Sequence, residues 1–573
     1  MHSMRSLRRV LSGLPYKKLL EGEAICKNLV VSPRTYSSQY VDSPFGDLVV
    51  PEITIQERIF KDLDKWPEHT ALVCGLTGRS YTYAQLRVLS RKVAAGFIKS
   101  GLKQGQVVAL VLPNLPEFMI AMLGAFQAGL VVSTINPLYA PEEINHQLSN
   151  SEASLVITFP MKVGDVKEAI EKSKSPNKPP IVVIHNLSES LPDGVKSFME
   201  LLMVQDADES AVDKINVNHT DLALLLYSSG TTGLPKGVRL THRNIVSNLT
   251  QVDHPAIRLA YETTKNYQDA TACVLPFFHV YGLSIGALTY LGNGTKLVTL
   301  PRFEPEPYLK ILKQHKISIA HVVPPLVQFM ANHPSVTESY LESLRCCING
   351  AAAISLSDAK KLLAKKHMIV MSGYGLTESS PVITSSRNTT VNLQTVGHVM
   401  PGAQVKIVNT ETKETIDPGQ PGEICCRGPQ IMEGYHKNEE ATSSTLVDGW
   451  LHTGDVGYFD DIGQLFIVDR IKELIKVKGF QVAPLELEEV MKQHPSVADV
   501  GVVGKPDSRV GEVPIAFVVK KPGASCNEKE LQQFVASKVA EYKQIGGVIF
   551  CNEIPKNMTG KILRRELKES LCK

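Results

Sequence analysis

Residues 222–237 read Leu-Ala-Leu-Leu-Leu-Tyr-Ser-Ser-Gly-Thr-Thr-Gly-Leu-Pro-Lys-Gly, and two different kinds of sequence meet within this stretch. Its start is a continuous apolar run, which is typical of a short strand buried on both faces of a sheet. The rest offers hydroxyl groups, closely spaced backbone N–H groups and one cation, Lys236. These groups bind polyphosphates, so the stretch predicts a phosphate-binding loop at the end of a buried strand.

The loop nearly matches the Walker A motif of P-loop NTPases. Gly230 and Lys236 have the separation of that motif, but Pro235 replaces its second glycine. Gly237 stands where a Ser or Thr would hold Mg²⁺. A P-loop NTPase is therefore disfavoured. A plain solvated turn is disfavoured too, because a run this rich in Gly, Ser and Thr directly follows an apolar strand.

Short apolar runs alternate with helical stretches along the N-terminal part of the chain. Such runs occupy residues 107–112, 155–158 and 181–184. Pro116 suits the first turn of a helix that Gly129 ends, and a buried strand follows. This alternation predicts an α/β fold with mostly parallel strands, arranged as a large multi-layer N-terminal domain.

The pattern changes near residue 470. A charged helix is predicted over 484–493, followed by two β-rich runs at 497–503 and 514–519 with a turn at 504–507. About the last hundred residues therefore predict a small α+β domain on a short hinge.

Length and composition agree with two soluble-type domains. The chain has 573 residues, more than the roughly 250–300 at which a single core stops growing. Hydrophobic residues make up 43% and charged residues 21%, which excludes a disordered, collagen-like or disulfide-framework protein. The net charge of +3 gives no field of one sign, so no nucleic-acid partner is predicted.

The first 36 residues differ from the rest in charge. They hold seven basic side chains (Arg5, Arg8, Arg9, Lys17, Lys18, Lys27 and Arg34) against two acids (Glu21 and Glu23). No uninterrupted apolar segment follows, so residues 1–36 predict a mitochondrial transit peptide and a matrix location. Residues 34–37, Arg-Thr-Tyr-Ser, resemble a matrix-peptidase site before Ser37. A basic tail on a cytoplasmic or peroxisomal protein is the alternative.

Neither a metal-binding cysteine cluster nor a membrane span is predicted. The ten cysteines show no C-x-x-C spacing and no histidines at ligand spacing, so they predict reduced, mostly buried thiols. The longest apolar stretch, 118–135, is interrupted by Gly124 and Gly129 and divides into a helix and a strand.

Six motifs, in one order, resemble those of the adenylate-forming acyl-CoA synthetases, a family that includes 4-coumarate:CoA ligases, medium-chain acyl-CoA synthetases and beetle luciferases. The resemblance covers nearly the whole chain after the leader. The motifs are the phosphate loop at 227–237, Gly-Tyr-Gly-Leu-Thr-Glu at 373–378, Gly-Glu-Ile-Cys-Cys-Arg-Gly at 422–428, Trp-Leu-His-Thr-Gly-Asp at 450–455, the hinge and thioester loop at 469–484, and Pro-Lys-Asn-Met-Thr-Gly-Lys at 555–561. Met558 and Thr559 stand where related enzymes vary.

The resemblance implies an N-terminal adenylation domain over 37–469, a mobile C-terminal domain over 470–573, and an ATP site. It assigns ATP binding to Ser228, Ser229, Gly230, Thr231, Thr232, Gly233, Lys236, Gly373, Tyr374, Gly375, Thr377, Asp455 and Arg470. Within this set, Tyr374 is expected against adenine, Asp455 at the ribose hydroxyls and Thr377 at the α-phosphate. Glu378 is expected to hold Mg²⁺.

The same resemblance implies the catalytic and substrate groups. Lys561 would bridge the carboxylate and the α-phosphate, and rotation at Asp469 would then bring Lys476 and Gln481 to the site for the thiol step. Lys478 and Gly479 are assigned to coenzyme A. His279 would gate the carboxylate pocket, and the acyl group would lie against Tyr281, Asn349, Gly350, Ala351 and Ala352.

The predicted reaction is ATP-dependent ligation of a fatty or aryl-substituted carboxylic acid to coenzyme A, with release of AMP and pyrophosphate, by a monomer or homodimer. Three alternatives share the resemblance. A luciferase-type monooxygenase would use the same adenylation step, a carrier-protein loading module would use another acceptor, and an inactive relative would only bind nucleotide. Lys236, Glu378, Asp455, Arg470 and Lys561 weigh against the inactive relative.

Overall fold

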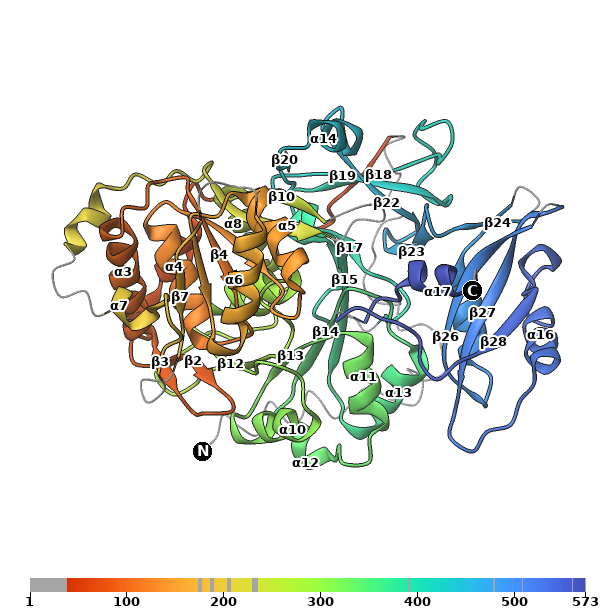
Figure 1. Ribbon diagram of the computed structural model, residues 1–573. Helices are drawn as coiled ribbons and strands as arrows, with labels where there is room; N and C mark the ends of the chain where they lie inside the picture. The colour runs from red at the N-terminus through yellow and green to blue at the C-terminus, as the bar shows by residue number, and fades with distance from the viewer. Residues whose placement is uncertain are drawn as a thin grey trace.

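The computed structural model describes residues 39–173, 178–185, 190–202, 208–228, 235–389, 392–477, 480–507, 509–558 and 560–571. The predicted transit peptide, residues 1–36, lies outside the described residues. In Figure 1 two helix-covered sheets lie side by side, a third sheet lies above them, and the C-terminal part of the chain forms a separate layer at the right.

The first sheet is eight-stranded and contains the predicted strand at 222–227 near its centre. Its order is β20 (Gly434–Tyr435), β10 (Lys236–Thr241), β9 (Leu222–Ser228), β5 (Val131–Ile135), β4 (Val107–Val111), β6 (Leu155–Thr158), β7 (Ile181–Val183) and β8 (Lys196–Ser197). The strands from β9 to β8 are parallel, while β10 and β20 pair antiparallel. The predicted runs at 107–112, 155–158 and 181–184 are thus confirmed as parallel strands.

Alternate residues of a strand point to opposite faces of a sheet. Both faces of this sheet are buried, because helices cover each of them. Val108 and Leu110 of β4 pack into the core shared with α3 (Tyr83–Lys99) and α4 (Pro116–Gln127). The odd-numbered residues of β4 pack on the other face with α5 (Pro141–Ser151) and α6 (Val163–Lys172). Pro116 occupies the first turn of α4, as the sequence predicts.

The second sheet has nine strands. Its order is β17 (His398–Val399), β16 (Val382–Ser385), β15 (Ile369–Gly375), β14 (Cys346–Asn349), β13 (Ile319–Val322), β11 (Ala270–Cys273), β12 (Lys296–Thr299), β2 (Thr70–Cys74) and β3 (Ser80–Thr82). The strands from β15 to β2 are parallel. One face packs on α10 (Pro305–Gln314), α11 (Pro324–Asn332), α12 (Glu338–Leu341) and α13 (Leu356–Lys365). The N-terminal part also contains α2 (Ile55–Phe60), α8 (His242–Val252) and α9 (Thr289–Leu291), and α7 (Phe198–Leu202), which packs on α3 beside the first sheet.

A six-stranded antiparallel sheet covers one end of the first two. Its order is β1 (Val41–Asp42), β18 (Gln404–Val408), β19 (Gly422–Arg427), β22 (Trp450–Phe459) and β21 (Leu446–Val447), and β23 (Leu465–Arg470) pairs with the later residues of β22. The helix α14 (Glu439–Thr445) precedes β21. This sheet places β23, at whose end the hinge is predicted, between the second sheet and the C-terminal part (Figure 1).

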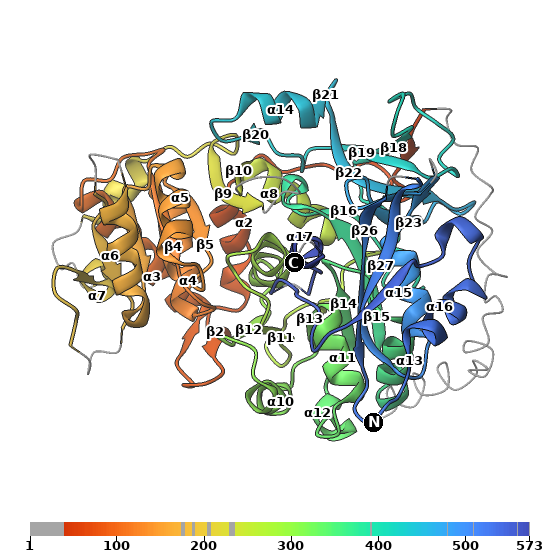
Figure 2. The same cartoon turned by 45° about the vertical axis from the view of Figure 1, so that its right-hand side comes forward.

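The C-terminal part forms its own sheet and core. The strand order is β25 (Phe480–Val482), β24 (Ile475–Val477), β27 (Gly511–Lys520) and β26 (Val497–Asp507), with β28 (Gly547–Phe550) beside β27. The helices are α15 (Pro484–Lys492), α16 (Glu528–Ala536) and α17 (Arg564–Ser570), and the core draws its buried residues from 475–548. Figure 2 brings this sheet forward, in front of β14 and β15. The predicted fold class, a large α/β domain with a small α+β domain, is confirmed.

The predicted turn at 504–507 is wrong. The strand β26 continues through these residues, and Asp507 pairs with Gly511 of β27. The Asp507 side chain explains the position of the turn, because its Oδ1 accepts hydrogen bonds from the backbone N–H groups of Arg509 (2.8 Å) and Val510 (3.1 Å). Asp507 does form the turn, but it begins the turn instead of ending it.

The described cysteines agree with the predicted reduced, mostly buried thiols. The eight described cysteines are free, and seven of them are buried. Across the described ranges, no helix combines the length and the apolar composition that a membrane crossing needs.

Candidate functional site

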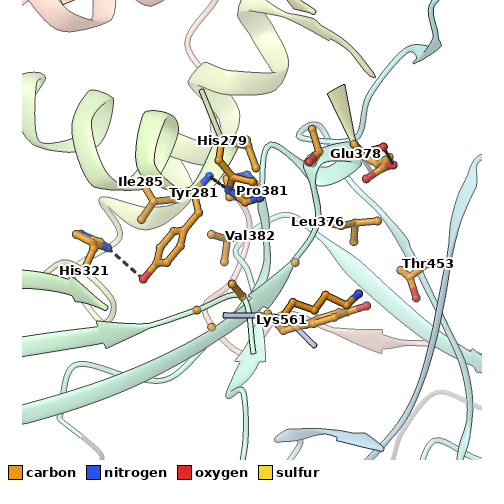
Figure 3. A pocket seen from close by; sticks show the side chains of 18 of the residues that line it. His279, Tyr281, Ile285, His321, Leu376, Glu378, Pro381, Val382, Thr453 and Lys561 are labelled. Atoms are coloured by element: carbon orange, nitrogen blue, oxygen red, sulfur yellow. Dashed lines mark hydrogen bonds between the residues drawn. The ribbon is translucent and has the colours of Figure 1, made fainter. Parts of the chain in front are cut away.

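A cavity of about 1000 Å³ opens where the first two sheets meet the C-terminal part of the chain. Its walls come from the carboxyl ends of β9, β14 and β15, from the segment 278–285, and from residues 556–563 of the C-terminal part. Ligand sites of α/β proteins form at the carboxyl ends of parallel strands. Figure 3 shows Tyr281 and His321 at one side of the view, Glu378 and Thr453 at the other, and Lys561 between them.

The phosphate end of the cavity is built around the Glu378 carboxylate. The Ser228 hydroxyl at the end of β9 donates to Glu378 Oε1 (3.0 Å), and the Tyr435 hydroxyl donates to the same oxygen (2.8 Å). Lys236 faces Ser228 across the β9–β10 pair, and its Nζ lies 5.1 Å from the centre of the Tyr435 ring. The predicted loop residues Ser229, Gly230, Thr231, Thr232 and Gly233 lie outside the described residues.

Tyr435 is a functional candidate that the sequence did not reveal. It lies in the two-residue strand β20, nearly 200 positions after Lys236, and reaches the site because it pairs with Val238 of β10. Burial and the neighbouring Glu378 carboxylate raise the pKa of Tyr435, so it is a neutral donor at physiological pH. No local motif marks it, and only the strand pairing brings it to Glu378.

The nucleotide end lies at β15 and β22. The Tyr374 hydroxyl donates to Asp455 Oδ2 (2.8 Å), and Arg470 Nε lies 3.1 Å from Asp455 Oδ1. Asp455 and Arg470 are register partners of β22 and β23, which explains their contact. Burial raises the pKa of Asp455, while the charge of Arg470 opposes this effect. Gly373, Tyr374, Gly375 and Thr377 all line the cavity beside this group.

Lys561 reaches the cavity from the C-terminal part of the chain. Gly560 has a φ of +80°, which an L side chain rarely adopts, and the Lys561 backbone N–H donates to Asn557 Oδ1 (2.9 Å). This tight turn holds the lysine at the cavity. Burial, followed by repulsion from Arg470, lowers the pKa of Lys561 to about 8. The lysine is therefore a cation close to its titration range.

Lys476 and Gln481, which are predicted to serve the thiol step, do not line the cavity. Lys476 and Gln481 are register partners of β24 and β25, and both side chains are exposed. Gln481 Nε2 donates to Thr410 Oγ1 (3.3 Å), outside the cavity. The structure therefore brings Lys561, but neither of these residues, to the cavity. Lys478 and Gly479 lie outside the described residues.

The acyl end of the cavity is lined by Tyr281 and its neighbours. Tyr281 begins a π-helix (Tyr281–Leu288), and a Cβ on the next residue, Gly282, would lie 2.3 Å from Pro276 O. Such wide turns are frequent at functional sites. His279 lines the same wall, and desolvation lowers its pKa to about 4, so it is neutral.

Three of the four predicted residues near 350 reach this cavity. Asn349, Gly350 and Ala351 line it, whereas Ala352 does not. The carbonyl of Ala352 instead accepts a hydrogen bond from Asn349 Nδ2 (2.9 Å). A Cβ at Gly350 would lie 2.9 Å from the Tyr281 ring, so glycine makes room for that ring.

A buried hydrogen-bond chain closes the acyl end. Tyr281 Oη donates to the Ile348 carbonyl (2.7 Å), so its oxygen can only accept from His321 Nδ1 (3.4 Å). Tyr290 Oη then donates to His321 Nε2 (2.9 Å). Burial lowers the pKa of His321 to about 3, which keeps the ring neutral. No motif in the sequence marks His321 or Tyr290, because both lie in ordinary apolar segments.

Comparison with known proteins shows the family to which the chain belongs. The family model described as "AMP-binding enzyme" matches residues 59–436, and the model described as "AMP-binding enzyme C-terminal domain" matches residues 486–561. The chain is 38% identical over 542 residues to 4-coumarate–CoA ligase 1 of Petroselinum crispum, covering 92% of this chain and 96% of that protein.

Two solved structures share the fold. ATP-bound MatB from Rhodopseudomonas palustris has a TM-score of 0.80 at 26% identity, covering 91% of this chain and 99% of that one. A benzoate CoA ligase from Burkholderia xenovorans has a TM-score of 0.80 at 25% identity, covering 90% and 100%. The predicted family and enzyme class, an acid–thiol ligase, are confirmed. The chain belongs to the AMP-binding enzyme family, whose members among its relatives are adenylate-forming CoA ligases.

Proposed function

We propose that the chain is an ATP-dependent carboxylate:CoA ligase that acts through an acyl-adenylate. The observation that carries the proposal is the position of Lys561, a cation of the C-terminal part, in one cavity with Glu378 and Tyr281. A phosphate end, a nucleotide end and an acyl end thus meet beside Lys561, which is half-buried. Condensation of a carboxylate with ATP brings two anions together, and a positioned cation stabilises that approach.

In the first half-reaction, a carboxylate oxygen of the acid attacks the α-phosphorus of ATP. The bond from that phosphorus to the bridging oxygen breaks, and pyrophosphate leaves. Lys561 would contact both reacting anions, Thr377 would donate to the α-phosphate, and Lys236 would hold the β- and γ-phosphates. Tyr374 and Asp455 would hold the nucleoside.

Glu378 suits the proposed magnesium ion. Hard cations prefer carboxylate oxygens, and both hydroxyl donors to Glu378 use Oε1. Among the described residues no donor contacts Oε2, which is therefore available as a ligand. When bound, Mg²⁺ would neutralise charge on the phosphates.

In the second half-reaction, the thiolate of coenzyme A attacks the acyl carbonyl and AMP leaves. We propose that the part from 470 to 573 first rotates about Asp469, because Lys561 occupies the cavity in the present arrangement. Rotation would exchange Lys561 for Lys476 and Gln481, which now lie exposed on the β24–β25 hairpin. Lys478 and Gly479, in the same hairpin sequence, would contact coenzyme A.

The acyl end supports a fatty or aryl-substituted acid as substrate. Ile285 and Val382 supply apolar wall, and Gly350 and Ala351 leave space beside the Tyr281 ring. The similarity to 4-coumarate–CoA ligases favours aryl-substituted acids within that class. The neutral His279 would face the carboxylate end without adding charge.

We further propose import into the mitochondrial matrix, on the basic and acid-poor composition of residues 1–36. Fusion of these residues to a fluorescent reporter tests this proposal, with Arg5, Arg8 and Arg9 changed to Glu as the control. Mitochondrial fluorescence that is lost in the control supports import, and diffuse fluorescence of the native fusion contradicts it.

A screen of acids tests the enzymatic proposal. Pyrophosphate and acyl-CoA are measured with ATP, Mg²⁺ and coenzyme A for acids of varied chain length and aromaticity. We expect equal amounts of pyrophosphate and acyl-CoA for at least one acid, and product formation lower by orders of magnitude with Lys561→Ala. Pyrophosphate release without thioester, for every acid that reacts, would contradict the ligase assignment.

A further inference from the structure

Three side chains of types that bind metal ions lie close together on the third sheet. The proposed reaction gives none of the three a role. Glu423 and Cys425 are two residues apart on β19, and His452 on β22 is the register partner of Cys425. The ligand atoms of the three residues all lie within 4.8 Å of one another. Strand pairing creates this cluster, which is why the spacing of cysteines and histidines in the sequence predicts no metal site.

Two of the three separations between these atoms are close to those around a tetrahedral metal ion. His452 Nδ1 lies 3.3 Å from Cys425 Sγ and 3.1 Å from Glu423 Oε2. Zinc–sulfur and zinc–nitrogen bonds of about 2.3 and 2.0–2.1 Å at tetrahedral angles place ligand atoms about 3.4–3.6 Å apart. Small shifts of the side chains would therefore admit an ion without moving the strands.

The donor set selects the class of metal. Thiolate, imidazole and carboxylate together suit Zn²⁺, whereas Mg²⁺ prefers oxygen ligands alone. Glu423 and Cys425 are buried, and Glu423 and His452 line the large cavity, so a water molecule can occupy the fourth position from that side. We propose that Glu423, Cys425 and His452 form a binding site for Zn²⁺, and that its occupancy weakens nucleotide binding.

The charge of the bound site balances. Binding replaces the thiol proton of Cys425, which passes to solvent, and the carboxylate and thiolate then neutralise the two charges of the ion. Lys413 Nζ lies 3.0 Å from Glu423 Oε2 in the present structure. Because the Lys413 side chain is 54% exposed, it can turn to water when the ion takes its place.

The site is connected to the nucleotide end through one backbone segment. Glu423 Oε1 accepts a hydrogen bond from the Gly454 N–H (3.3 Å), and the next residue, Asp455, contacts Tyr374 and Arg470. A metal ion that draws the Glu423 carboxylate toward Cys425 would break the hydrogen bond from the Gly454 N–H to Glu423 Oε1. Zinc and nucleotide are therefore expected to weaken each other's binding reciprocally.

Cobalt substitution tests the site directly. Co²⁺ is titrated into the chelator-treated full chain, and absorbance reports a thiolate-to-cobalt band and the visible bands of tetrahedral cobalt. We expect one equivalent of Co²⁺, displaced by Zn²⁺, with the thiolate band absent in Cys425→Ser and affinity at least about ten-fold lower in His452→Gln. Cys551→Ser, which changes a cysteine in the C-terminal part, is the matched control and should match wild type.

The same bands in Cys425→Ser, or no binding by wild type, would overturn the site. Thermal melts must show that Cys425→Ser is folded. If that variant is unfolded, the cobalt affinity of His452→Gln decides whether the site exists.

Calorimetric titration with AMP tests the coupling between zinc and nucleotide, because AMP binding needs neither Mg²⁺ nor turnover. We expect AMP to bind about five-fold or more weakly with Zn²⁺ present, in wild type but not in Cys425→Ser. Equal AMP affinity with and without bound Zn²⁺ would overturn the coupling.

Discussion

The Glu378 carboxylate is oriented by two hydroxyl groups from distant parts of the chain. Ser228 and Tyr435 both donate to Oε1, and the ring of Tyr435 also lies under the Lys236 cation. One tyrosine thus contacts both the proposed metal ligand and the proposed phosphate ligand. This arrangement fixes the carboxylate before any ion arrives, which lowers the cost of ordering it on binding.

Tyr435→Phe should raise the Mg²⁺ concentration needed for adenylation. The variant keeps the ring beside Lys236 and removes one hydrogen bond to a charged group, a loss of about 1.5–3 kcal/mol. We expect about a ten-fold or larger fall in pyrophosphate release at limiting Mg²⁺, with partial recovery at high Mg²⁺. The measurement is initial rate against Mg²⁺ concentration.

Tyr458→Phe is the matched control for this effect. Tyr458 lies on β22, stacked on Phe466, and is not part of the cavity wall. Its Mg²⁺ curve should superimpose on that of wild type. A Tyr435→Phe curve that also superimposes on wild type would show that Glu378 needs no orientation by Tyr435.

The depressed pKa of Lys561 predicts a pH limit on adenylation. Its value of about 8 in the folded protein means that the cation is lost as pH rises through 8, and kcat/KM reports the free enzyme. We expect kcat/KM for pyrophosphate release to fall above about pH 8. The residual activity of Lys561→Ala should lack this fall, and the same descending limb in that variant would contradict the assignment.

The lowered pKa of Lys561 also makes the stability of the fold depend on pH. Stability rises with pH where the adenylation activity falls. The unfolded lysine keeps its proton up to its ordinary pKa of 10.5, so between about pH 8 and 10.5 the unfolded chain binds more protons than the folded chain. Burial of the charged lysine therefore costs stability below pH 8, and that cost is relieved as pH rises through this window.

At the scale of the element, β15 carries two glycines whose surroundings differ. A Cβ at Gly375 would lie 1.7 Å from the Pro381 carbonyl oxygen, whereas a Cβ at Gly373 would lie 3.2 Å from the nearest atom, Thr384 O. The close approach at Gly375 allows the segment 377–381 to fold back beside the strand and carry Glu378 to the cavity. Backbone proximity, not backbone flexibility, requires glycine there.

Gly375→Ala should therefore lower the melting temperature more than Gly373→Ala does. The first substitution forces backbone to move, and overpacking of this kind costs about 1–3 kcal/mol. The Cβ of Gly373→Ala would lie 3.2 Å from Thr384 O, and a shift of a few tenths of an ångström relieves that contact. Thermal melts at one scan rate compare the two variants, and equal melting temperatures would show that the 377–381 segment moves freely.

The elements that were predictable have strong local signals. The apolar run at 222–227, the Pro116 helix start and the parallel strands at 107–111 and 155–158 follow from burial and periodicity. The site was predictable only where its residues lie in continuous motifs. Tyr435, His321 and the Glu423–Cys425–His452 cluster depend on which strands pair, and local sequence does not determine pairing.

The misplaced turn at 504–507 has a different physical origin. Gly-Lys-Pro-Asp has the composition of a turn, but the long β26–β27 ladder continues through it to Asp507. Pairing with a partner strand outweighed local preference at Lys505 and Pro506, because a strand's preferences depend on its context.

At the scale of the molecule, a partly buried ionic group joins the hinge to the end of the chain. Arg564 Nε lies 2.9 Å from Glu473 Oε2, just after β23, and Nη1 lies 2.7 Å from Glu488 Oε1 in α15. Asp469 Oδ2 accepts from the Leu485 N–H (2.9 Å). These contacts tie the segment that carries Lys561 to the hinge, so movement of the C-terminal part would carry Lys561 with it.

The central claim is that Lys561 serves only the first half-reaction and leaves the cavity for the second. Single-turnover experiments on Lys561→Ala separate the two, with pyrophosphate release measured from ATP and acid, and acyl-CoA formation measured from supplied acyl-adenylate and coenzyme A. We predict that pyrophosphate release falls by orders of magnitude, since each 1.4 kcal/mol of barrier is about a factor of ten, while thioester formation stays near wild type. Equal loss in both half-reactions, in a variant whose thermal melt is native-like, would contradict the account.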